Sequence, residues 1–326
     1  MLASYKLLIR DLQEKDYWDM TIAIVVVFSI GVGLNLDGFV SHPLQLILGV
    51  CCWIILIALL FGEEKDVRLQ VAVAIVFATI GEYIASPFLG AYIYRLENVP
   101  GYASPGHGMA YLTAVALGRS TFFHRHRQLV MGFTLSIGTL WSLWGSVLAE
   151  RGDTAGALLF CVFFIFVLKG RAPLLYVGAF YITSFLELVG TYAGTWAWAV
   201  YEPTLGLSQA NPPSGIAAWY CLIDAVALTG APWLARVIQG FLQWTSRHNL
   251  SERLCLRKFI LIFSGGFPSL HGLFSLDSPA VSAEDASTPN DSMTGNQKGD
   301  GVSADGVCNR AGCRRMVNGS SDLPVR

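Results

Sequence analysis

Long apolar stretches alternate with short polar loops along the chain as far as about residue 235. A membrane-spanning helix needs roughly 17–25 predominantly apolar residues. Several stretches meet or approach this length, and the fourth and sixth of them are short enough to be tilted or re-entrant. The stretches lie at residues 20–36, 43–62, 68–94, 105–118, 128–149, 154–168, 173–200 and 213–235. The pattern predicts an all-α integral membrane protein with about eight transmembrane helices.

The placement of basic residues supports this count, because cytoplasmic loops carry most of the Lys and Arg of a membrane protein. If the N-terminus is cytoplasmic, the loops expected outside hold only Arg95 and Arg151. The basic residues expected inside, up to the eighth stretch, are Lys6, Arg10, Lys15, Lys65, Arg68, Arg119, Arg125, Arg127, Lys169 and Arg171. We therefore expect a multi-pass protein of the cell (inner) membrane with both termini in the cytoplasm.

The flanking segments have a different character. Residues 1–19 form a polar, amphipathic segment, expected on the cytoplasmic side. Residues 236–276 are basic and then apolar but interrupted by Gly and Pro, which fits a membrane-surface segment better than a ninth span. Residues 277–326 are rich in Ser, Asp, Gly and Asn, a composition typical of disordered chain.

Composition agrees with the membrane assignment and narrows the partners. Of 326 residues, 53% are hydrophobic and 14% charged, whereas a soluble domain has about 25% charged residues. The net charge of −1 gives no indication of a nucleic-acid partner. Cys308 and Cys313 lack the paired Cys or His residues of a zinc site, and no nucleotide-binding loop is present. We expect no metal and no cofactor.

Two regions of the chain resemble each other. The segment "IGEYIASPFLGAYIY" (80–94) matches "FLELVGTYAGTWAWA" (185–199), with Glu82 aligned to Glu187 and Gly90 to Gly194. A turn follows each segment, "SPGHGMA" and then "PPSGIA", and each next helix contains "AVAL". The halves would be residues 20–118 and 128–235. Because each half crosses the membrane an even number of times, the prediction is two parallel four-helix repeats.

Three acidic residues lie deep within the apolar stretches. Glu82 and Glu187 are each roughly 20 Å from the inner boundary at ~1.5 Å per residue, and Asp224 has a comparable depth from the outside. An acid at this depth costs about 2.5–3.5 kcal/mol, so such residues usually face the protein interior and serve a function. We expect Glu82, Glu187 and Asp224 to act as catalytic proton donors and acceptors. The alternative is that they only form hydrogen bonds between helices.

Other candidate site residues surround the acids. His107 lies in the first turn motif and is predicted to be catalytic, or else a polar anchor at the membrane interface. Its counterpart in the second half is Ser214, a candidate substrate-binding residue. Aromatic faces stabilise cations, so the aromatic pairs just beyond the glutamates are candidates for substrate binding, although membrane-interface anchoring also explains aromatics there. These pairs are Tyr92, Tyr94, Trp196 and Trp198.

The stretches "GAYIYRLENVPGYASPGHGMAYL" and "LELVGTYAGTWAW", with "NPPSGIAAWY", resemble a family of uncharacterised bacterial polytopic membrane proteins. The resemblance covers roughly residues 70–235 and implies no activity. A fainter similarity is to the membrane carotenoid-biosynthesis hydratases, which also have a helix glutamate, a Gly-x-Tyr-x-Tyr-like stretch and a proline turn. Glu82, Gly90, Tyr92, Tyr94 and Pro100 fit that pattern, and the similarity implies isoprenoid or lipid substrates.

Three functions remain open from the sequence. The first is an enzyme that protonates, hydrates, cyclises or isomerises an isoprenoid-like lipid with intramembrane carboxylates. The second is a transporter or permease with an acidic site at the repeat interface near the membrane midplane. The third is a structural membrane protein. The expected partner is a membrane lipid or another lipid-soluble molecule.

Overall fold

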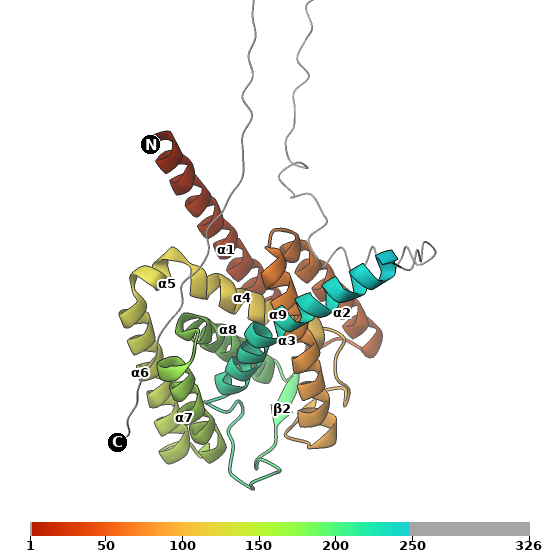
Figure 1. Cartoon of the computed structure of the whole chain (residues 1–326). Helices are drawn as coiled ribbons and strands as arrows, with labels where there is room; N and C mark the ends of the chain where they lie inside the picture. The colour runs from red at the N-terminus through yellow and green to blue at the C-terminus, as the bar shows by residue number, and fades with distance from the viewer. Residues whose placement is uncertain (1, 248–326) are drawn as a thin grey trace, which may run out of the picture. The chain divides into compact units, whose positions relative to one another are not determined.

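The computed structural model describes residues 2–247, with side chains from residue 14 to residue 244. The expected surface segment beyond residue 247 and the expected disordered tail (277–326) lie outside the described residues. The described chain is mostly helical (Figure 1). Its elements are α1 (Leu2–Asp37), α2 (His42–Phe61), α3 (Lys65–Tyr83), the π-helical turn η1 (Ile84–Phe88), β1 (Tyr92–Tyr94), α4 (Ala103–Arg119), α5 (Thr121–Arg125), α6 (Arg127–Val147), α7 (Thr154–Lys169), α8 (Pro173–Tyr192), β2 (Trp196–Trp198) and α9 (Ala217–Arg247).

Several helices are long and apolar enough to cross a membrane, as expected of a multi-pass membrane protein. Within residues 2–247 there are six of them: Glu14–Asp37, His42–Phe61, Lys65–Phe88, Arg127–Val147, Pro173–Tyr192 and Ala217–Trp244. The fourth and sixth expected spans form the shorter helices α4, of 17 residues, and α7, of 16 residues. The segment expected to precede the first span is continuous with it in α1.

The expected spans 68–94 and 173–200 are wrong at their C-terminal ends. The first ends in η1 and the second at Tyr192, and each is followed by a glycine with positive φ, +69° at Gly90 and +70° at Gly194. Glycine adopts this left-handed conformation without the steric cost that other residues meet, so it ends a helix and redirects the chain. The aromatic pairs then continue as two short strands rather than as helix.

These strands form a two-stranded antiparallel ribbon. Tyr92 lies opposite Trp198, Ile93 opposite Ala197, and Tyr94 opposite Trp196. Successive side chains of a strand point to opposite faces, so the four aromatic rings share one face of the ribbon. Ile93 occupies the other face and is exposed.

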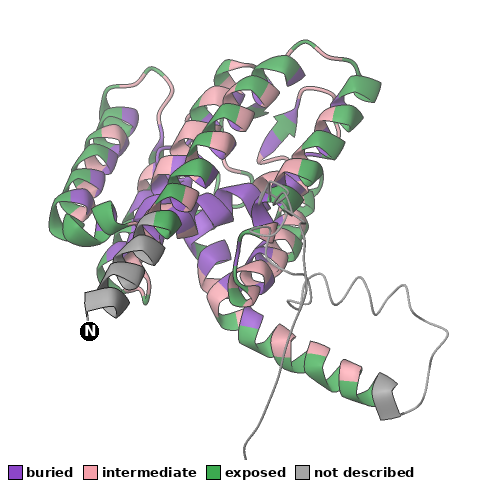
Figure 2. Ribbon diagram, turned by 90° about the horizontal axis from the view of Figure 1, so that it is seen from above, coloured by how far each residue is buried: buried purple, intermediate pink, exposed green. Residues whose placement is uncertain are grey.

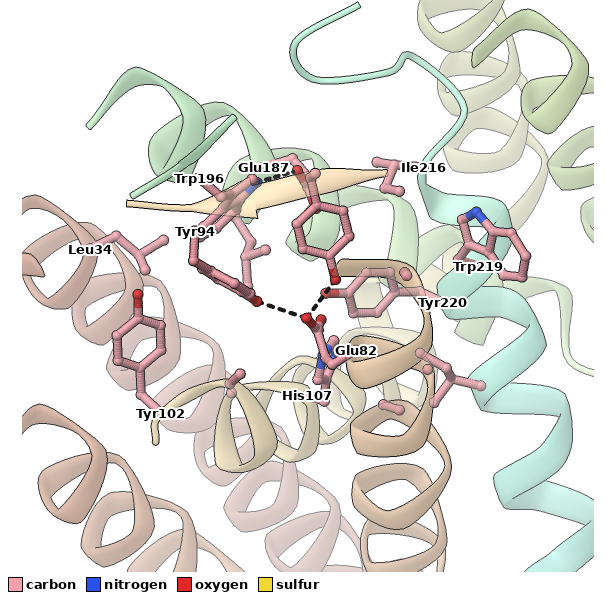
Figure 3. A pocket seen from close by; sticks show the side chains of 18 of the residues that line it. Leu34, Glu82, Tyr94, Tyr102, His107, Glu187, Trp196, Ile216, Trp219 and Tyr220 are labelled. Carbon is pink, nitrogen blue, oxygen red and sulfur yellow. Dashed lines mark hydrogen bonds and ion pairs between the residues drawn. The ribbon is translucent and has the colours of Figure 1, made fainter. Parts of the chain in front are cut away.

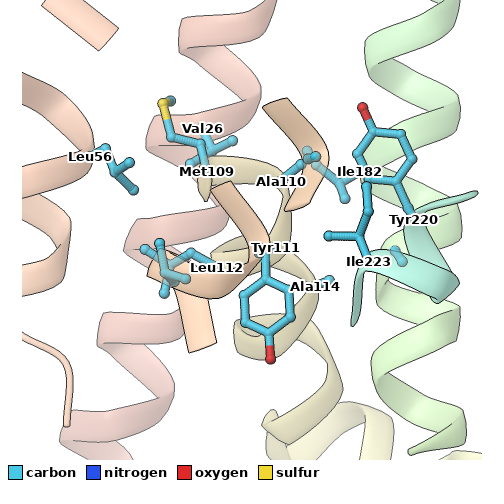
Figure 4. Packing of buried hydrophobic residues seen from close by; sticks show 14 of the residues in the cluster. Val26, Leu56, Met109, Ala110, Tyr111, Leu112, Ala114, Ile182, Tyr220 and Ile223 are labelled. Carbon is cyan, nitrogen blue, oxygen red and sulfur yellow. The ribbon is translucent and has the colours of Figure 1, made fainter. Parts of the chain in front are cut away.

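Helix α4 lies at the centre of the buried part of the bundle, where Figure 2 shows the buried residues concentrated. It packs on α1, α2, α3 and α8. A Cβ at Gly118 would lie 2.9 Å from the backbone nitrogen of Leu175, so the small residue permits close α4–α8 packing. The cluster around α4 joins residues of α1, α2, α3, α4, α8 and α9. Figure 4 shows part of it, including Val26, Leu56, Met109, Tyr111, Leu112, Ile182 and Ile223.

A buried ionic cluster joins the end of α4 to the first helices. The guanidinium of Arg119 donates to Asp19 on α1, with Nε–Oδ1 at 2.8 Å, and to both carboxylate oxygens of Glu63 at 2.6 and 2.7 Å. The indole of Trp18 also donates to Glu63, at 3.1 Å. Asp19 and Glu63 are only 3% and 5% exposed. The cluster therefore connects α1, the α2–α3 loop and α4 through charges with little access to solvent.

Candidate functional site

Glu82, on the last turn of α3, is held by three polar side chains (Figure 3). Its Oε2 accepts hydrogen bonds from the hydroxyls of Tyr92 at 2.5 Å and Tyr94 at 2.8 Å. Its Oε1 lies 2.7 Å from Nε2 of His107, on α4. The shared proton can reside on the histidine nitrogen or on the carboxyl oxygen without breaking this contact. The pair is therefore suited to accept and donate a proton.

Glu187, on α8, has an equivalent position beside the second strand. Its Oε2 accepts hydrogen bonds from the indole nitrogens of Trp196 and Trp198, each at 3.0 Å. Glu187 is 5% exposed. Indole N–H groups only donate and do not release their protons at ordinary pH. Glu187 is therefore fixed by two neutral donors, whereas Glu82 contacts a group that can itself gain or lose a proton.

The β1–β2 ribbon places these two sets of partners beside each other. The rings of Tyr92 and Trp198 have centroids 4.7 Å apart, and those of Tyr94 and Trp196 are 6.0 Å apart. A Cβ at Gly190 would fall 2.0 Å from the Trp196 ring, so only glycine leaves room for this indole against α8. The aromatics of the strands thus bind the carboxylates, while Tyr83 and Tyr192 at the helix ends are exposed.

The π-helical turn accounts for a difference in spacing between the two halves. Glu82 is eight residues before Gly90 (90 − 82), whereas Glu187 is seven residues before Gly194 (194 − 187). A π-turn accommodates one additional residue in a helix. Here it contains Pro87, which lacks the N–H for a helical hydrogen bond. The extra residue is absorbed before the strand, so both strands still meet in register.

Buried backbone that is not in a helix requires partners for its polar groups, and Arg95 and Arg151, the two arginines expected from the sequence in outside loops, supply some of them. Arg151 donates to the carbonyls of Trp198 at 2.7 Å, Ala199 at 2.6 Å and Gln209 at 2.7 Å. Arg95 donates to the carbonyls of Asp37 and Val40. The only outside basic residues expected from the sequence are thus used to hold the ribbon and the loops next to it.

Both glutamates line a cavity of about 980 Å³. This volume is at the upper end of the range for small-molecule sites, roughly 300–1,000 Å³. His107 and the four aromatics of the ribbon also line it, and the remaining wall is mainly Leu, Ile, Val and Phe. Tyr220 of α9 lines it as well, with its ring 5.5 Å from that of His107. The cavity therefore combines apolar walls with a small group of convergent polar side chains.

Two predicted site residues lie apart from this group. Ser214 precedes α9 and does not line the cavity; its backbone N–H donates to Asp153 Oδ2 at 2.7 Å. Asp224 is 1% exposed and also lies outside the cavity wall, and its Oδ2 has no hydrogen-bond partner among the described residues. The structure brings together Glu82, Glu187, His107 and the four aromatics, but neither Ser214 nor Asp224.

Sequence reasoning missed three residues that support or extend the site. Asp153, completely buried, accepts from the backbone N–H groups of Gly156, Ala210 and Ser214. Gln209 donates through Nε2 to the carbonyl of Ala91 at 3.0 Å. Tyr220 precedes Asp224 by one helical turn, and that spacing on an apolar helix was the available signal for it.

Trp198→Phe is expected to lower the free energy of unfolding by about 1–3 kcal/mol, because Glu187 loses one of its two donors. Thermal unfolding of the purified protein in detergent measures the loss, with the exposed Trp233 replaced by Phe as the control. In a Glu187→Leu background the effect of Trp198→Phe should disappear. An unchanged effect there would mean that ring volume, rather than the hydrogen bond, is responsible.

No family model, curated protein or solved structure matches this chain. The residues between 14 and 244 also contain no group of three or more His, Cys, Asp or Glu arranged to hold a metal ion. The functional argument therefore depends on the geometry of the cavity.

Proposed function

We propose that this protein is a membrane-embedded enzyme that transfers protons to and from an isoprenoid-like lipid. The observation that carries the proposal is the contact of 2.7 Å between Glu82 and His107 in the wall of an apolar cavity. An acid–base pair in such a place has few uses in structure alone, because an uncharged hydrophobic contact would stabilise the same helices at lower cost. The faint similarity to carotenoid-biosynthesis hydratases is compatible with this substrate class.

The chemical step follows from the partners of the two acids. The Glu82–His107 pair donates a proton to one carbon of a double bond, and the π electron pair of that bond forms the new C–H bond. The neighbouring carbon becomes a carbocation, which loses a proton from an adjacent carbon or is attacked by water or by another double bond. Loss of a proton and addition of water each return one proton to the pair, whereas attack by a double bond forms a new carbocation that ends in one of these two ways. Isomerisation, hydration and cyclisation therefore share the first step.

Glu187 and the aromatic rings would stabilise the cation. In its ionised form Glu187, fixed by two indole donors, presents negative charge beside the cavity, and preorganised charge of this kind lowers the barrier where opposite charge develops. The faces of Tyr92, Tyr94 and Trp198 add cation–π attraction. We assign proton transfer to Glu82 and His107, cation stabilisation to Glu187, and substrate contact to the aromatics.

The proposal includes the finer architecture expected from the sequence. Eight spans would form two parallel repeats, residues 20–118 and 128–235, in the cell (inner) membrane with both termini cytoplasmic. The matching positions of Glu82 and Glu187 beside equivalent strands support the repeat. The short helices α4 and α7 would be the fourth and sixth spans.

Transport is the alternative. A permease for a hydrophilic solute needs polar groups along its path, whereas this cavity is lined mainly by aliphatic and aromatic side chains. The wall thus favours a lipid-soluble substrate.

Lipid profiling of a strain that lacks the protein tests the proposal. We expect a lipid precursor to accumulate, wild-type protein to remove it, and Glu82→Gln to fail. Glu150→Gln, at an exposed loop position, is the matched control and should restore the wild-type profile. Unchanged lipids with altered solute uptake would identify a transporter, and full complementation by both Glu82→Gln and Glu187→Gln would make the acids structural.

A further inference from the structure

The cavity extends to both sides of the carboxylates. In Figure 3, Leu34 and Tyr102 lie on one side of Glu82, and Ile216 and Trp219 lie on the other. All of these residues line the same cavity. The acid–base pair therefore lies along the course of the cavity and not at a closed end.

The first side, which we call the α1 arm, follows α1, α2 and α3. Its wall on α1 lies between Ile24 and Leu36, a stretch of thirteen residues, or about 18 Å of helix. Residues of α2 and α3 also line it, among them Leu48, Cys52 and Phe77. The arm reaches the surface beside Phe28, which is 68% exposed.

The second side, which we call the α9 arm, lies between the first turns of α7 and α9. Its wall includes Leu158 and Leu159 of α7, and Trp219 and Leu222 of α9. Leu158 and Trp219 are also half exposed. Both arms thus reach the protein surface at apolar side chains of helices, which in a membrane protein face lipid rather than water, and the β2–α9 loop adds Glu202 and Thr204 to the cavity wall.

The charge of the wall limits what the arms can hold. No Lys or Arg lines the cavity within the described residues, and its ionisable groups are Glu82, Glu187, Glu202, His107, cysteines and tyrosines. The side chains that bind phosphate and diphosphate groups in proteins are chiefly those of Arg and Lys. A phosphorylated head group would find no Lys or Arg in this wall and would meet the carboxylates of Glu82, Glu187 and Glu202.

We propose that the substrate is a single long, uncharged chain that passes through the cavity, with one tail in each arm and the reacting double bond between them. The inference rests on the proposed function and adds where the reacting bond lies. Reaction occurs at a bond with chain on both sides, and the arms set the length accepted on each side. Gly33 in the α1 arm and Leu159 in the α9 arm are the positions that determine this length.

Gly33 permits a direct test, because a Cβ built on it meets no atom within 4 Å. A side chain there would enter the α1 arm without displacing the protein. Gly31 on the same helix is equally open but does not line the cavity, so Gly31→Phe is the matched control for Gly33→Phe. Leu159→Trp narrows the α9 arm, and Val162→Trp, on α7 but outside the wall, is its control.

The measurement is binding of squalene, a linear uncharged isoprenoid, and of farnesol, its half-length analogue, to detergent-purified protein by native mass spectrometry. We expect Gly33→Phe and Leu159→Trp each to weaken squalene binding at least about tenfold, since several buried CH₂ groups lose their contacts. The affinity for farnesol, which one open arm can hold, should change by less than about twofold. The controls should bind both probes as wild type does.

Three outcomes would overturn the two-armed cavity: loss of squalene binding in only one of the two variants, equal loss of both probes, or tighter binding of farnesyl diphosphate than of farnesol. The thermal midpoint of every variant shows whether a loss of binding comes from a folding defect. The smaller substitution Gly33→Leu provides a second variant of the same position. Binding is independent of turnover, so an inactive Glu82→Gln protein should still bind squalene. If lipid profiling contradicts the proposed enzymatic function, the binding measurement still decides whether a linear lipid occupies both arms.

Discussion

Arg119→Met is expected to lower the free energy of unfolding by about 3–5 kcal/mol, because it leaves two buried carboxylates without their cation. Burial alone would disfavour a charged guanidinium, but the hydrogen bonds and charges of Glu63 and Asp19 outweigh it and raise the pKa of Arg119. The residue therefore stays charged at every pH at which the protein is folded. Removing it deletes the ionic contacts of α4 with α1 and the α2–α3 loop.

Thermal and denaturant unfolding in detergent provide the measurement. The control is Lys15→Met, which removes an exposed ion pair of 3.1 Å with Glu64 and should cost at most about 1 kcal/mol. Adding Asp19→Asn and Glu63→Gln to Arg119→Met should recover part of the loss, because the uncompensated charges are then gone. Equal losses for Arg119→Met and Lys15→Met would show that the cluster contributes no more than a surface pair.

Glu82→Gln and His107→Gln are each expected to lower turnover by about 10²–10⁴-fold, the usual contribution of a general acid or base. The double variant should be little worse than either single one, because groups that act as a unit are not additive. Both substitutions keep the size of the side chain and a hydrogen-bonding group, so the cavity should keep its shape.

The assay follows conversion of the lipid identified by profiling, with purified protein in vesicles. Tyr83→Phe, at an exposed position next to Glu82, should retain wild-type turnover. Glu187→Gln should lower turnover less than Glu82→Gln does, since it removes charge stabilisation but leaves the proton-transfer pair. Losses of Glu82→Gln and His107→Gln that multiply in the double variant would mean that the two residues act separately.

The sequence predicted the burial of the two glutamates better than it predicted their partners or the backbone that joins them. Depth in an apolar stretch was enough to place Glu82 and Glu187 inside the bundle, since a charge at that depth has to avoid lipid. The ribbon could not be anticipated in the same way. Three-residue strands at the end of a long apolar run have too few residues to show an alternating pattern, and short apolar runs are ambiguous between helix and strand.

The comparison of the turns failed for a related reason. His107 is the fifth residue of α4, whereas Ser214, its counterpart by motif, precedes the first residue of α9. A shared Pro-x-(His/Ser)-Gly pattern does not fix where the following helix begins, and the side chain points elsewhere if the helix starts later. The roles of Asp153 and Arg151 depend on contacts with residues about 45 to 60 positions away, which no local pattern encodes.

The ribbon has one more consequence, for how the two acids can move. Tyr92 and Tyr94 bind Glu82, while Trp196 and Trp198, paired with them across the ribbon, bind Glu187. Three residues per strand are too few to slide past one another without losing the whole pairing, so the ribbon shifts as one rigid piece. Any tilt that loosens the hydroxyls from one carboxylate also displaces the indoles from the other. The positions of the two acids are therefore linked, and a substrate that displaces one of them also changes the hydrogen bonds of the other.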